Sequence, residues 1–423
     1  MEKYLVSGGY RLEGNIRVGG AKNSVLPILA AVLLNDSSEE TILTNVPRIR
    51  DVVKMVEILV SLGAEINWSG SDMAISTKNV HSYMVDERLM REMRSTVFLM
   101  GALLGRFGQV CISRPGGCAI GNRPIGLHLK GLEALGAQFR EEQQGYLYAS
   151  CPRLTGADIQ LDYPSVGATE NIMLAAVYAR GVTTIRNAAK EPEIVDVQNF
   201  LNKMGARIRG AGTDQICVEG VTKLHSVEHR VVPDRIVAGT LMLAAVATRG
   251  DVVVENIIPA HLYAMNAKLR EAGIQVREEN DRIHILAPER PKAVEVVRTL
   301  PYPGFPTDLQ AQMMAVLTRA KGSSMVVESV FEARFKHVGE LTRMGANIVV
   351  TTDNRTAIIH GVEKLTGAIV TATDLRAGAA LVLAGLSAEG ETRVEELDHI
   401  LRGYENLDGD LIRLGAKIKR IVE

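Results

Sequence analysis

The feature that most constrains the fold is a short signature that recurs six times along the chain. Each copy consists of an apolar residue, a glycine, a small residue and then an alternating strand pattern. The signature glycines are Gly63, Gly136, Gly205, Gly273, Gly345 and Gly415. They stand 68 to 73 residues apart, so six units of about 70 residues account for nearly all of the 423 residues. Such a fixed period predicts one supersecondary unit built in several copies.

Each repeat follows the same internal order. A short strand leads into a helix rich in Ala, Leu and Met that is apolar nearly all round, which indicates burial. A β-branched strand and an amphipathic helix follow. That helix ends at the signature glycine, where a positive φ is expected, and a hairpin completes the unit. The predicted buried helices are Ser24–Leu34, Arg94–Phe107, Ala168–Ala179, Arg235–Ala247, Asp308–Ala320 and Leu375–Leu386. The pattern predicts an α/β protein.

The two chain ends complete the repeat pattern. The sixth unit stops after Lys417–Val422 without its second hairpin strand, and Lys3–Ser7 has the right pattern to supply it. Six units divide naturally into three and three. We therefore predict domain one at 22–232 and a discontinuous domain two at 1–21 and 233–423. Short crossings between domains favour a hinge, with the active site in the cleft between them.

Composition excludes several classes of protein. The net charge is −1 with both signs interspersed and aromatic residues make up 4%, so no nucleic-acid surface is expected. The longest apolar runs are far below the ~18–20 residues of a membrane span. Nine histidines and four cysteines form no metal-site or disulfide pattern, so we expect neither metal nor cofactor. Cys111, Cys151 and Cys217 lie in or beside strand patterns and are interpreted as structural. The N-terminus has no apolar leader, which favours a soluble cytoplasmic protein.

One glycine-rich stretch, Arg114–His128, carries the strongest chemical signal. It places Cys118 directly after two glycines and five residues before Arg123. Guanidinium groups lower the pKa of a nearby thiol because they favour the thiolate. The stretch is also longer than its counterparts in other repeats, which is typical of binding or catalytic loops. The alternative is that Cys118 packs as a small hydrophobic residue.

The starts of the buried helices carry polar residues. Helix N-termini hold a partial positive charge and free N–H groups, so several of them together could bind an anion. Lys22 and Arg94 are unusual there, because a cation beside a positive helix end suggests that an anion is also present. For Thr169, Asp234 and Asp374, ordinary helix capping is an equal alternative.

Eight short motifs resemble those of the enolpyruvyl transferases, in the family's order and across the whole chain. They are K-N-x-x-L-P at Lys22–Pro27, P-G-G-C-x-I-G-x-R-P at Pro115–Pro124, S-V-G-A-T at Ser165–Thr169, E-P-E-I-V-D at Glu191–Asp196, P-D-R at Pro233–Arg235, F-P-T-D-x-Q-A-Q at Phe305–Gln312, A-T-D-L-R at Ala372–Arg376 and R-G-Y-E at Arg402–Glu405.

The resemblance implies a fold and a reaction. The fold is a two-domain inverse α/β barrel with three repeats per domain and sheets around buried helices. The reaction moves the enolpyruvyl group of phosphoenolpyruvate to the 3-hydroxyl of UDP-N-acetylglucosamine and releases phosphate, in the branch of the family that begins peptidoglycan biosynthesis. Both substrates are small molecules, and no oligomeric state is implied.

The resemblance also implies roles for individual residues. Cys118 matches a proton donor that forms a covalent adduct with phosphoenolpyruvate and reacts with fosfomycin, and Asp308 matches a candidate base. Lys22, Asn23, Arg123 and Arg402 match phosphoenolpyruvate contacts, with Lys22 and Arg402 counted as catalytic. The residues that match nucleotide-sugar contacts are Arg94, Arg123, Pro124, Ile125, Gly126, Leu127, Ser165, Val166, Gly167, Asp308 and Val330. Glu191, Asp234 and Arg376 are secondary matches, and His128 is interpreted as structural.

Three positions depart from the family pattern. Gly126 and Leu401 stand where Asp is common in the family, and Tyr163 stands where some members have Lys. These departures leave open a catalytically silent paralogue that only binds UDP-N-acetylglucosamine. A second alternative is 5-enolpyruvylshikimate-3-phosphate synthase, which shares the fold but lacks the loop cysteine.

Overall fold

The structure is a computed structural model of the chain, and it describes residues 2–113, 120–121, 124–141 and 145–422. By its internal contacts the chain divides into two compact units. Unit 1 comprises Met1–Gly19, Ala119–Asn122 and Pro233–Glu423, and unit 2 comprises Gly20–Cys118 and Arg123–Val232. Each unit has a hydrophobic core of its own. The buried residues of the two cores do not overlap, so each unit satisfies the burial requirement of a separate domain.

Unit 2 has three inner helices that are buried at nearly every position. They are α1 (Lys22–Val32), α4 (Leu99–Phe107) and α6 (Val166–Ala176), and a 3₁₀ turn, η1 (Arg94–Phe98), precedes α4. The other helices are α2 (Arg50–Ser61), α3 (Glu87–Glu92), α5 (Gly126–Ala134) and α7 (Pro192–Lys203). The sequence patterns did not predict α3.

Three sheets complete unit 2. The first has the order β13 (Glu228–Arg230), β3 (Thr41–Thr44), β5 (Asp72–Ser76) and β4 (Glu65–Ser69). The second has the order β11 (Arg207–Arg209), β12 (Gln215–Glu219), β10 (Val182–Arg186) and β9 (Asp158–Gln160). The third has the order β6 (Gln109–Ser113), β8 (Tyr146–Ser150) and β7 (Gln138–Glu141). The strands alternate buried and less buried residues, as expected when one sheet face covers a core.

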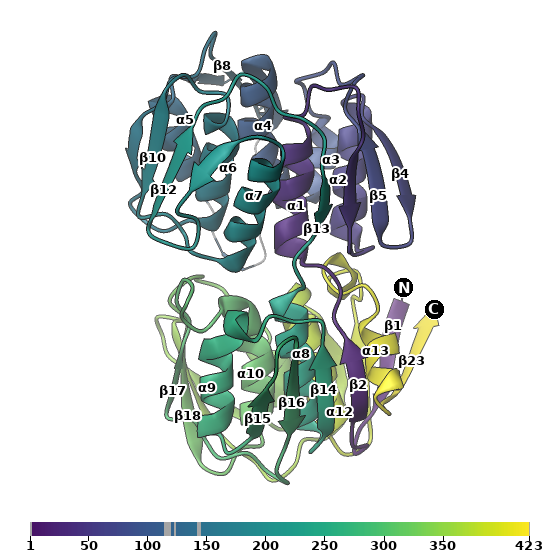
Figure 1. Ribbon diagram of the computed structural model, residues 1–423. Coiled ribbons are helices and arrows are strands. Elements are labelled where there is room, and N and C mark those ends of the chain that lie inside the picture. Colours follow the sequence, from purple (N-terminus) through teal and green to yellow (C-terminus); the bar gives the residue numbers. More distant parts are fainter. Residues whose placement is uncertain (1, 114–119, 122–123, 142–144, 423) are drawn as a thin grey trace. The chain divides into compact units, whose positions relative to one another are not determined.

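Unit 1 repeats this plan with α8 (Arg235–Ala247), α10 (Gln310–Leu317) and α12 (Leu375–Ser387) inside. These three helices contact one another and lie side by side in Figure 1. The outer helices are α9 (Tyr263–Glu271), α11 (Val338–Arg343) and α13 (Leu407–Arg413). Single 3₁₀ turns stand before α9, α10 and α13, namely η3 (Pro259–Leu262), η4 (Thr307–Leu309) and η5 (Ile400–Arg402).

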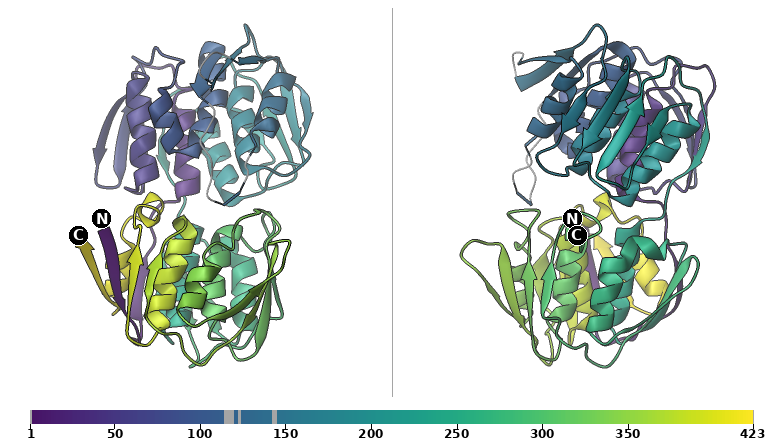
Figure 2. Two further views of the ribbon diagram at one scale, coloured as in Figure 1. Left: turned by 180° about the vertical axis from the view of Figure 1, so that it is seen from behind. Right: turned by 60° about the vertical axis from the view of Figure 1, so that its left-hand side comes forward.

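The three sheets of unit 1 bring distant parts of the chain together. The first has the order β21 (Ile369–Thr371), β22 (Glu391–Glu395), β1 (Glu2–Ser7) and β23 (Lys417–Val422). The second has the order β15 (Gln275–Glu278), β16 (Arg282–Leu286), β14 (Asp251–Glu255) and β2 (Glu13–Arg17). The third has the order β17 (Val296–Arg298), β18 (Ser323–Val327), β20 (Thr356–His360) and β19 (Asn347–Val350). β1 pairs antiparallel with β23, with Glu2 opposite Val422, which places the chain ends together in Figure 2. The predicted pairing of the two ends is confirmed.

The first and fourth repeats exchange their first strands. β2 directly precedes α1 in sequence, yet it pairs in parallel with β14 in unit 1. β13 directly precedes α8, yet it pairs in parallel with β3 in unit 2. The first strand of each of these two repeats therefore belongs to the sheet of the other repeat. The predicted domain boundaries assigned residues 13–17 to domain two and residues 228–230 to domain one, but the repeat pattern did not identify the strands with which they pair.

The repeat signature reflects a recurring backbone turn. All six signature glycines have positive φ, between 82° and 106°, which confirms the predicted left-handed position after each amphipathic helix. A second left-handed position, which the sequence reasoning missed, follows the central strands at Asn45, Asn187 and Asn256. Each of these asparagines donates from Nδ2 to a main-chain carbonyl near the end of the neighbouring parallel strand. Asparagine suits this position because it tolerates positive φ and bonds locally.

Candidate functional site

In unit 1, the centre of the candidate site is the carboxylate of Asp308 in the 3₁₀ turn η4. Arg334 Nη2 lies 2.5 Å from Asp308 Oδ1, and Arg376 Nη2 lies 2.9 Å from Asp308 Oδ2. Both guanidinium groups are buried, and Arg334 Nη1 also lies 3.7 Å from Asp374 Oδ1. Burial lowers the pKa of Arg376, but the charges of Asp308 and other neighbours outweigh it, so this pKa lies above its usual value. The sequence analysis did not single out Arg334.

A buried polar network supports the residues around Asp308. Tyr404 OH lies 2.8 Å from Thr240 Oγ1 on α8 and accepts from Gln312 Nε2 on α10 at 3.2 Å. Gln312 Nε2 also donates to the main-chain oxygen of Asp308 at 3.0 Å. Arg402, a predicted phosphoenolpyruvate contact, lies two residues before Tyr404 at the end of η5 and is partly buried. The network therefore joins the backbone of Asp308 to the segment that carries Arg402.

Glu328 is a second buried acid that the sequence reasoning missed. It is fully buried and accepts hydrogen bonds from Thr299 Oγ1 at 2.8 Å and Thr307 Oγ1 at 2.9 Å. Its Oε1 also accepts from the main-chain N–H of Val330 at 2.8 Å. Thr307 begins η4 and Val330 is a predicted nucleotide-sugar contact, so this one carboxylate fixes both segments.

At the starts of α8 and α12 in unit 1, Asp234 and Asp374 act as ordinary helix caps. Asp234 Oδ1 accepts from the main-chain N–H groups of Ile236 and Val237 at the start of α8. Asp374 Oδ1 accepts from those of Arg376 and Ala377 at the start of α12. Both carboxylates therefore satisfy N–H groups that have no partner within the helix.

In unit 2, Lys22 starts α1 and its partner is Asp51 on α2. Lys22 Nζ lies 2.6 Å from Asp51 Oδ2, and both side chains are buried. No side chain caps the start of α1, because its N-cap residue is Ala21. The sequence analysis inferred an anion beside Lys22 and did not identify Asp51, which supplies one. Asn23 follows on the same turn and is partly buried.

The remaining predicted contacts of unit 2 gather at helix starts. Arg94 begins η1 and is partly buried. Ser165 is the N-cap of α6 and its Oγ accepts from Ala168 N at 3.3 Å, with Val166 and Gly167 beginning the helix. Thr169, another possible cap, instead accepts from Ala189 N through Oγ1 at 3.1 Å. These residues therefore sit at the N-termini where the sequence analysis expected an anion site.

The segment Pro124–Leu127 leads into α5. Pro124 and Gly126 are exposed, and Ile125 and Leu127 are partly buried against the core. His128 is buried, and its Nδ1 lies 3.0 Å from Nδ2 of Asn171 on α6. A side chain at Gly167 would lie 3.0 Å from the imidazole of His128. His128 on α5 therefore packs against α6, which supports its structural interpretation.

Glu170, one turn into α6, is an unexpected buried acid. Its side chain is 0% exposed, and neither carboxylate oxygen has a hydrogen-bond partner among the described residues. Burial, followed by the charges of Glu193 and Glu191, raises the pKa of Glu170 well above its usual value. Glu191, a secondary match, is the N-cap residue of α7. An acid of this kind stays protonated to a higher pH than an exposed glutamate.

Two of the strongest predictions lie outside the described residues. These are Cys118, the predicted proton donor, and Arg123, the predicted phosphoenolpyruvate and nucleotide-sugar contact. Between them, Gly121 is described, and its φ of 130° lies in the range that favours glycine. The roles assigned to Cys118 and Arg123 therefore rest on the sequence.

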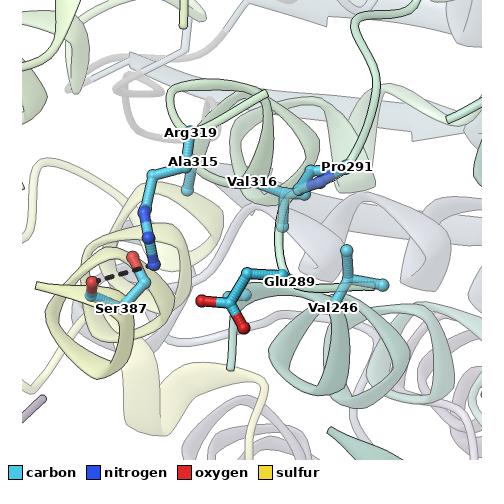
Figure 3. A pocket seen from close by; sticks show the side chains of 8 residues that line it. Val246, Glu289, Pro291, Ala315, Val316, Arg319 and Ser387 are labelled. Atoms are coloured by element: carbon cyan, nitrogen blue, oxygen red, sulfur yellow. Dashed lines mark hydrogen bonds between the residues drawn. The ribbon is translucent and has the colours of Figure 1, made fainter. Parts of the chain in front are cut away.

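A small pocket in unit 1 lies away from the Asp308 site. Figure 3 shows its lining residues Val246, Glu289, Pro291, Ala315, Val316, Arg319 and Ser387, close to the C-terminal ends of the three inner helices. Arg319 donates from Nη1 to the main-chain oxygen of Ser387 at 3.3 Å. Burial lowers the pKa of Arg319, helped by the charges of Arg249 and Arg290. Cations commonly bind the free carbonyls of helix C-termini, so Arg319 has a structural role.

Among the residues that the structure describes, no cluster of three or more His, Cys, Asp or Glu side chains could hold a metal ion. Within the same residues, no helix combines the length and apolar character that crossing a membrane requires.

Comparison with known proteins identifies the family. Residues 6–411 match the model of EPSP synthase (3-phosphoshikimate 1-carboxyvinyltransferase). Among solved structures, the enolpyruvyl transferase NikO from Streptomyces tendae superposes with a TM-score of 0.90 at 25% identity, over 99% of this chain and 98% of that one. An EPSP synthase from Acinetobacter baumannii has a TM-score of 0.78 at 18% identity, over 100% of both chains, and supports the fold alone. The chain belongs to the EPSP synthase family of enolpyruvyl transferases.

Two curated relatives define the branch within this family. The UDP-N-acetylglucosamine 1-carboxyvinyltransferase 1 of Symbiobacterium thermophilum is 55% identical over 99% of this chain and 95% of its own length. The UDP-N-acetylglucosamine 1-carboxyvinyltransferase 2 of Caldanaerobacter subterraneus subsp. tengcongensis is 54% identical over 100% of both chains. The resemblance to enolpyruvyl transferases and the predicted fold class are confirmed, and the chain is a transferase.

Proposed function

We propose that this enzyme transfers the enolpyruvyl group of phosphoenolpyruvate to the 3-hydroxyl of UDP-N-acetylglucosamine and releases phosphate. The observation that carries the proposal is the identity of 54–55% with full-length relatives of that name. The sequence supports it, because Lys22, Cys118, Arg123, Asp308 and Arg402 all stand at their motif positions. This reaction would begin peptidoglycan synthesis, and we expect it to take place in the cytoplasm.

The reaction needs three proton transfers. In the addition step, a proton goes to the methylene carbon of phosphoenolpyruvate, and the sugar oxygen attacks the adjacent carbon while its own proton leaves. In the elimination step, phosphate departs and the methyl group returns a proton, which restores the enol double bond. We assign the first proton delivery to Cys118, which would also form the covalent adduct. A well-placed acid or base contributes about 10²–10⁴-fold to the rate.

We propose that Asp308 acts on the 3-hydroxyl of the sugar in two ways: it orients this hydroxyl, and it accepts the proton that the hydroxyl loses. Its carboxylate is held by Arg334 and Arg376, and paired guanidinium groups favour the ionised form. A carboxylate so fixed can accept a hydrogen bond from the hydroxyl and direct it at the enol carbon. To take up the proton completely, it must weaken one of its two guanidinium contacts.

We propose that the remaining predicted residues bind the charged groups of the two substrates. Lys22, Asn23, Arg123 and Arg402 would hold the phosphate and carboxylate of phosphoenolpyruvate, since Arg binds planar anions through two hydrogen bonds. The helix-start residues Arg94, Ser165–Gly167 and the segment Pro124–Leu127, with Val330, would bind the nucleotide sugar. In this proposal both units, 22–232 and 1–21 with 233–423, contribute to one active site that closes when the sugar nucleotide binds.

The deciding experiment measures phosphate release from phosphoenolpyruvate with UDP-N-acetylglucosamine, with shikimate-3-phosphate, and with no acceptor. Release with the nucleotide sugar alone is the expected result. Release with shikimate-3-phosphate instead would replace this function by that of EPSP synthase. If no acceptor supports release while UDP-N-acetylglucosamine still binds, the chain is a silent paralogue and the proposed catalysis is wrong.

Fosfomycin gives an independent test of Cys118. We expect time-dependent inactivation and a covalent adduct of one molecule per chain on the peptide containing Cys118, with no adduct in the Cys118→Ser variant. An adduct on another cysteine, or none, would contradict the assignment. Cys118→Ser should also reduce turnover by about 10²-fold or more.

A further inference from the structure

We propose that Asp196, on α7 of unit 2, is a positioning residue that sets the placement of Lys22. This inference rests on the proposed function for the role of Lys22. The sequence analysis quoted Asp196 only as part of a motif and gave it no task. Asp196 is 8% exposed, yet its carboxylate has three hydrogen-bond partners, which lie in two separate segments of unit 2.

The first hydrogen bond reaches the start of α1. Ser24 Oγ donates to Asp196 Oδ2 at 2.5 Å, and Ser24 is fully buried. Ser24 lies two residues after Lys22, within the first turn of a helix that has no side-chain cap. Because a helix turn moves as a unit, any shift of Ser24 along or around the helix axis carries Lys22 with it.

The second and third hydrogen bonds reach the segment where the chain leaves unit 2. Val232 N donates to Asp196 Oδ2 at 3.1 Å, and His229 Nε2 lies 2.9 Å from Asp196 Oδ1. Val232 O in turn accepts from Ala21 N at 2.8 Å, directly before Lys22. Asp196, Val232, Ala21 and Ser24 thus form a closed ring of bonds around the start of α1.

The chemistry of the cluster excludes a nucleophilic role. Ser24 bonds to the carboxylate rather than to the imidazole, and Ser24, Asp196 and His229 are all buried. An ionised carboxylate only accepts hydrogen bonds, so Nε2 of His229 carries the proton. Nδ1 of His229 has no hydrogen-bond partner among the described residues. Phe200 packs edge-on against this ring, with centroids 5.4 Å apart.

The two carboxylates near Lys22 have different tasks in this picture. Asp51 bonds to the ammonium group directly and offsets its charge. Asp196 does not touch Lys22 and acts only through the backbone of α1. Loss of Asp196 should therefore leave the charge of Lys22 unchanged and displace it, which weakens its contact with phosphoenolpyruvate.

The test compares Ser24→Ala and Asp196→Asn with a matched control, Tyr4→Phe. Tyr4 OH donates to Asp408 Oδ1 at 3.0 Å inside unit 1, so its loss also removes a hydroxyl–carboxylate bond of a buried residue. We expect both unit 2 variants to raise KM for phosphoenolpyruvate by about 5–50-fold, with KM for UDP-N-acetylglucosamine changed less than 2-fold. Tyr4→Phe should lower Tm and leave both KM values unchanged.

Amide hydrogen exchange in the intact variants supplies a readout that does not depend on turnover. Exchange at Ala21 and Val232 should rise at least 10-fold in Asp196→Asn and stay as in the wild type in Tyr4→Phe. Unchanged exchange, or equal rises in the two KM values, overturns the positioning role. Failure of the wild type to release phosphate would instead overturn the proposed function, and exchange would still decide whether Asp196 fixes the start of α1.

Discussion

The two units present oppositely arranged charges at the starts of their inner helices. In unit 2 a buried cation, Lys22, forms a salt bridge with a buried carboxylate, Asp51. In unit 1 a carboxylate, Asp308, is held by two buried guanidinium groups, Arg334 and Arg376. The first arrangement pairs a cation with a carboxylate beside a positive helix end, and in the second the carboxylates of Asp308 and Asp374 offset the charges of the two guanidinium groups. Both arrangements can therefore accept an anionic ligand without leaving a cation unbalanced when no ligand is bound.

The largest expected effect comes from breaking the arrangement of unit 1. Asp308→Ala removes the carboxylate that two buried guanidinium groups share, so we expect the stability of unit 1 to fall by about 3 kcal/mol. Turnover should fall by about 10²–10⁴-fold. Urea denaturation and steady-state kinetics measure the two effects. Asp308→Asn serves as the control, because it keeps one acceptor oxygen and should lose turnover with less loss of stability. If Asp308→Asn keeps more than a tenth of the activity, the carboxylate is not needed.

Breaking the pair of unit 2 should cost nearly as much stability. Asp51→Ala leaves the buried ammonium of Lys22 without its carboxylate, with an expected loss of about 3 kcal/mol. Removing both charges in Lys22→Met/Asp51→Leu should restore part of that loss, although the double variant would be inactive. A double-mutant cycle from urea midpoints measures the coupling. A coupling energy below about 0.5 kcal/mol would show that the pair contributes little.

Substitution of Glu170 should have a smaller effect on stability, and this effect should be a gain rather than a loss. Its pKa is raised in the folded state, so its contribution to stability is present below the unfolded pKa and is lost as the pH rises toward the folded pKa. Glu170→Gln removes this loss and should raise Tm by about 2–4 °C near neutral pH, with a smaller gain at pH 4. Calorimetry across pH 4–8 tests it, with the exposed Glu133→Gln as control. A Tm gain that does not depend on pH would contradict the assignment.

The smallest expected effect is at Gly126, the departure from the family pattern that begins α5. Gly126 is exposed, and a side chain there would meet nothing within 4 Å. The first turn of α5 has no acidic residue. Gly126→Asp should therefore stabilise unit 2 by about 0.5–1 kcal/mol through the helix dipole and the lower entropy of the unfolded chain. Gly126→Asn separates the two effects, because it lacks the charge. Any destabilisation would show that glycine is required at this position.

Sequence reasoning predicted those features that repeat along the chain. The six signature glycines fixed the number of units, and the incomplete sixth unit identified Lys3–Ser7 as the partner of Lys417–Val422. Local sequence patterns were enough to predict these features because the same turn and the same strand recur in each repeat. The exchange of β2 and β13 was not predictable in this way, because a parallel pairing is set by the packing of whole units rather than by any local signal.

The candidate site was predictable in its motif residues and not in their partners. Lys22 and Asp308 stand in recognisable strings, whereas Asp51, Arg334 and Glu328 lie 20–30 residues away in unremarkable stretches. A salt bridge between distant residues leaves no periodic trace in one sequence. Asp196 stands in a recognised motif, but its partners Ser24 and Val232 are distant in sequence, so the positioning role proposed for it was not predictable either.

The pairing of β1 affects how the protein can fold while it is synthesised on the ribosome. β1 lies between β22 and β23, so the first strand to be made needs partners from the last part of the chain. At 5–20 residues per second, it must wait about 20–80 s for them. Unit 2 is complete in sequence by Val232, so it can fold while the first strands of unit 1 remain unpaired. Translation speed and chaperone access during that interval would then govern the yield of the enzyme.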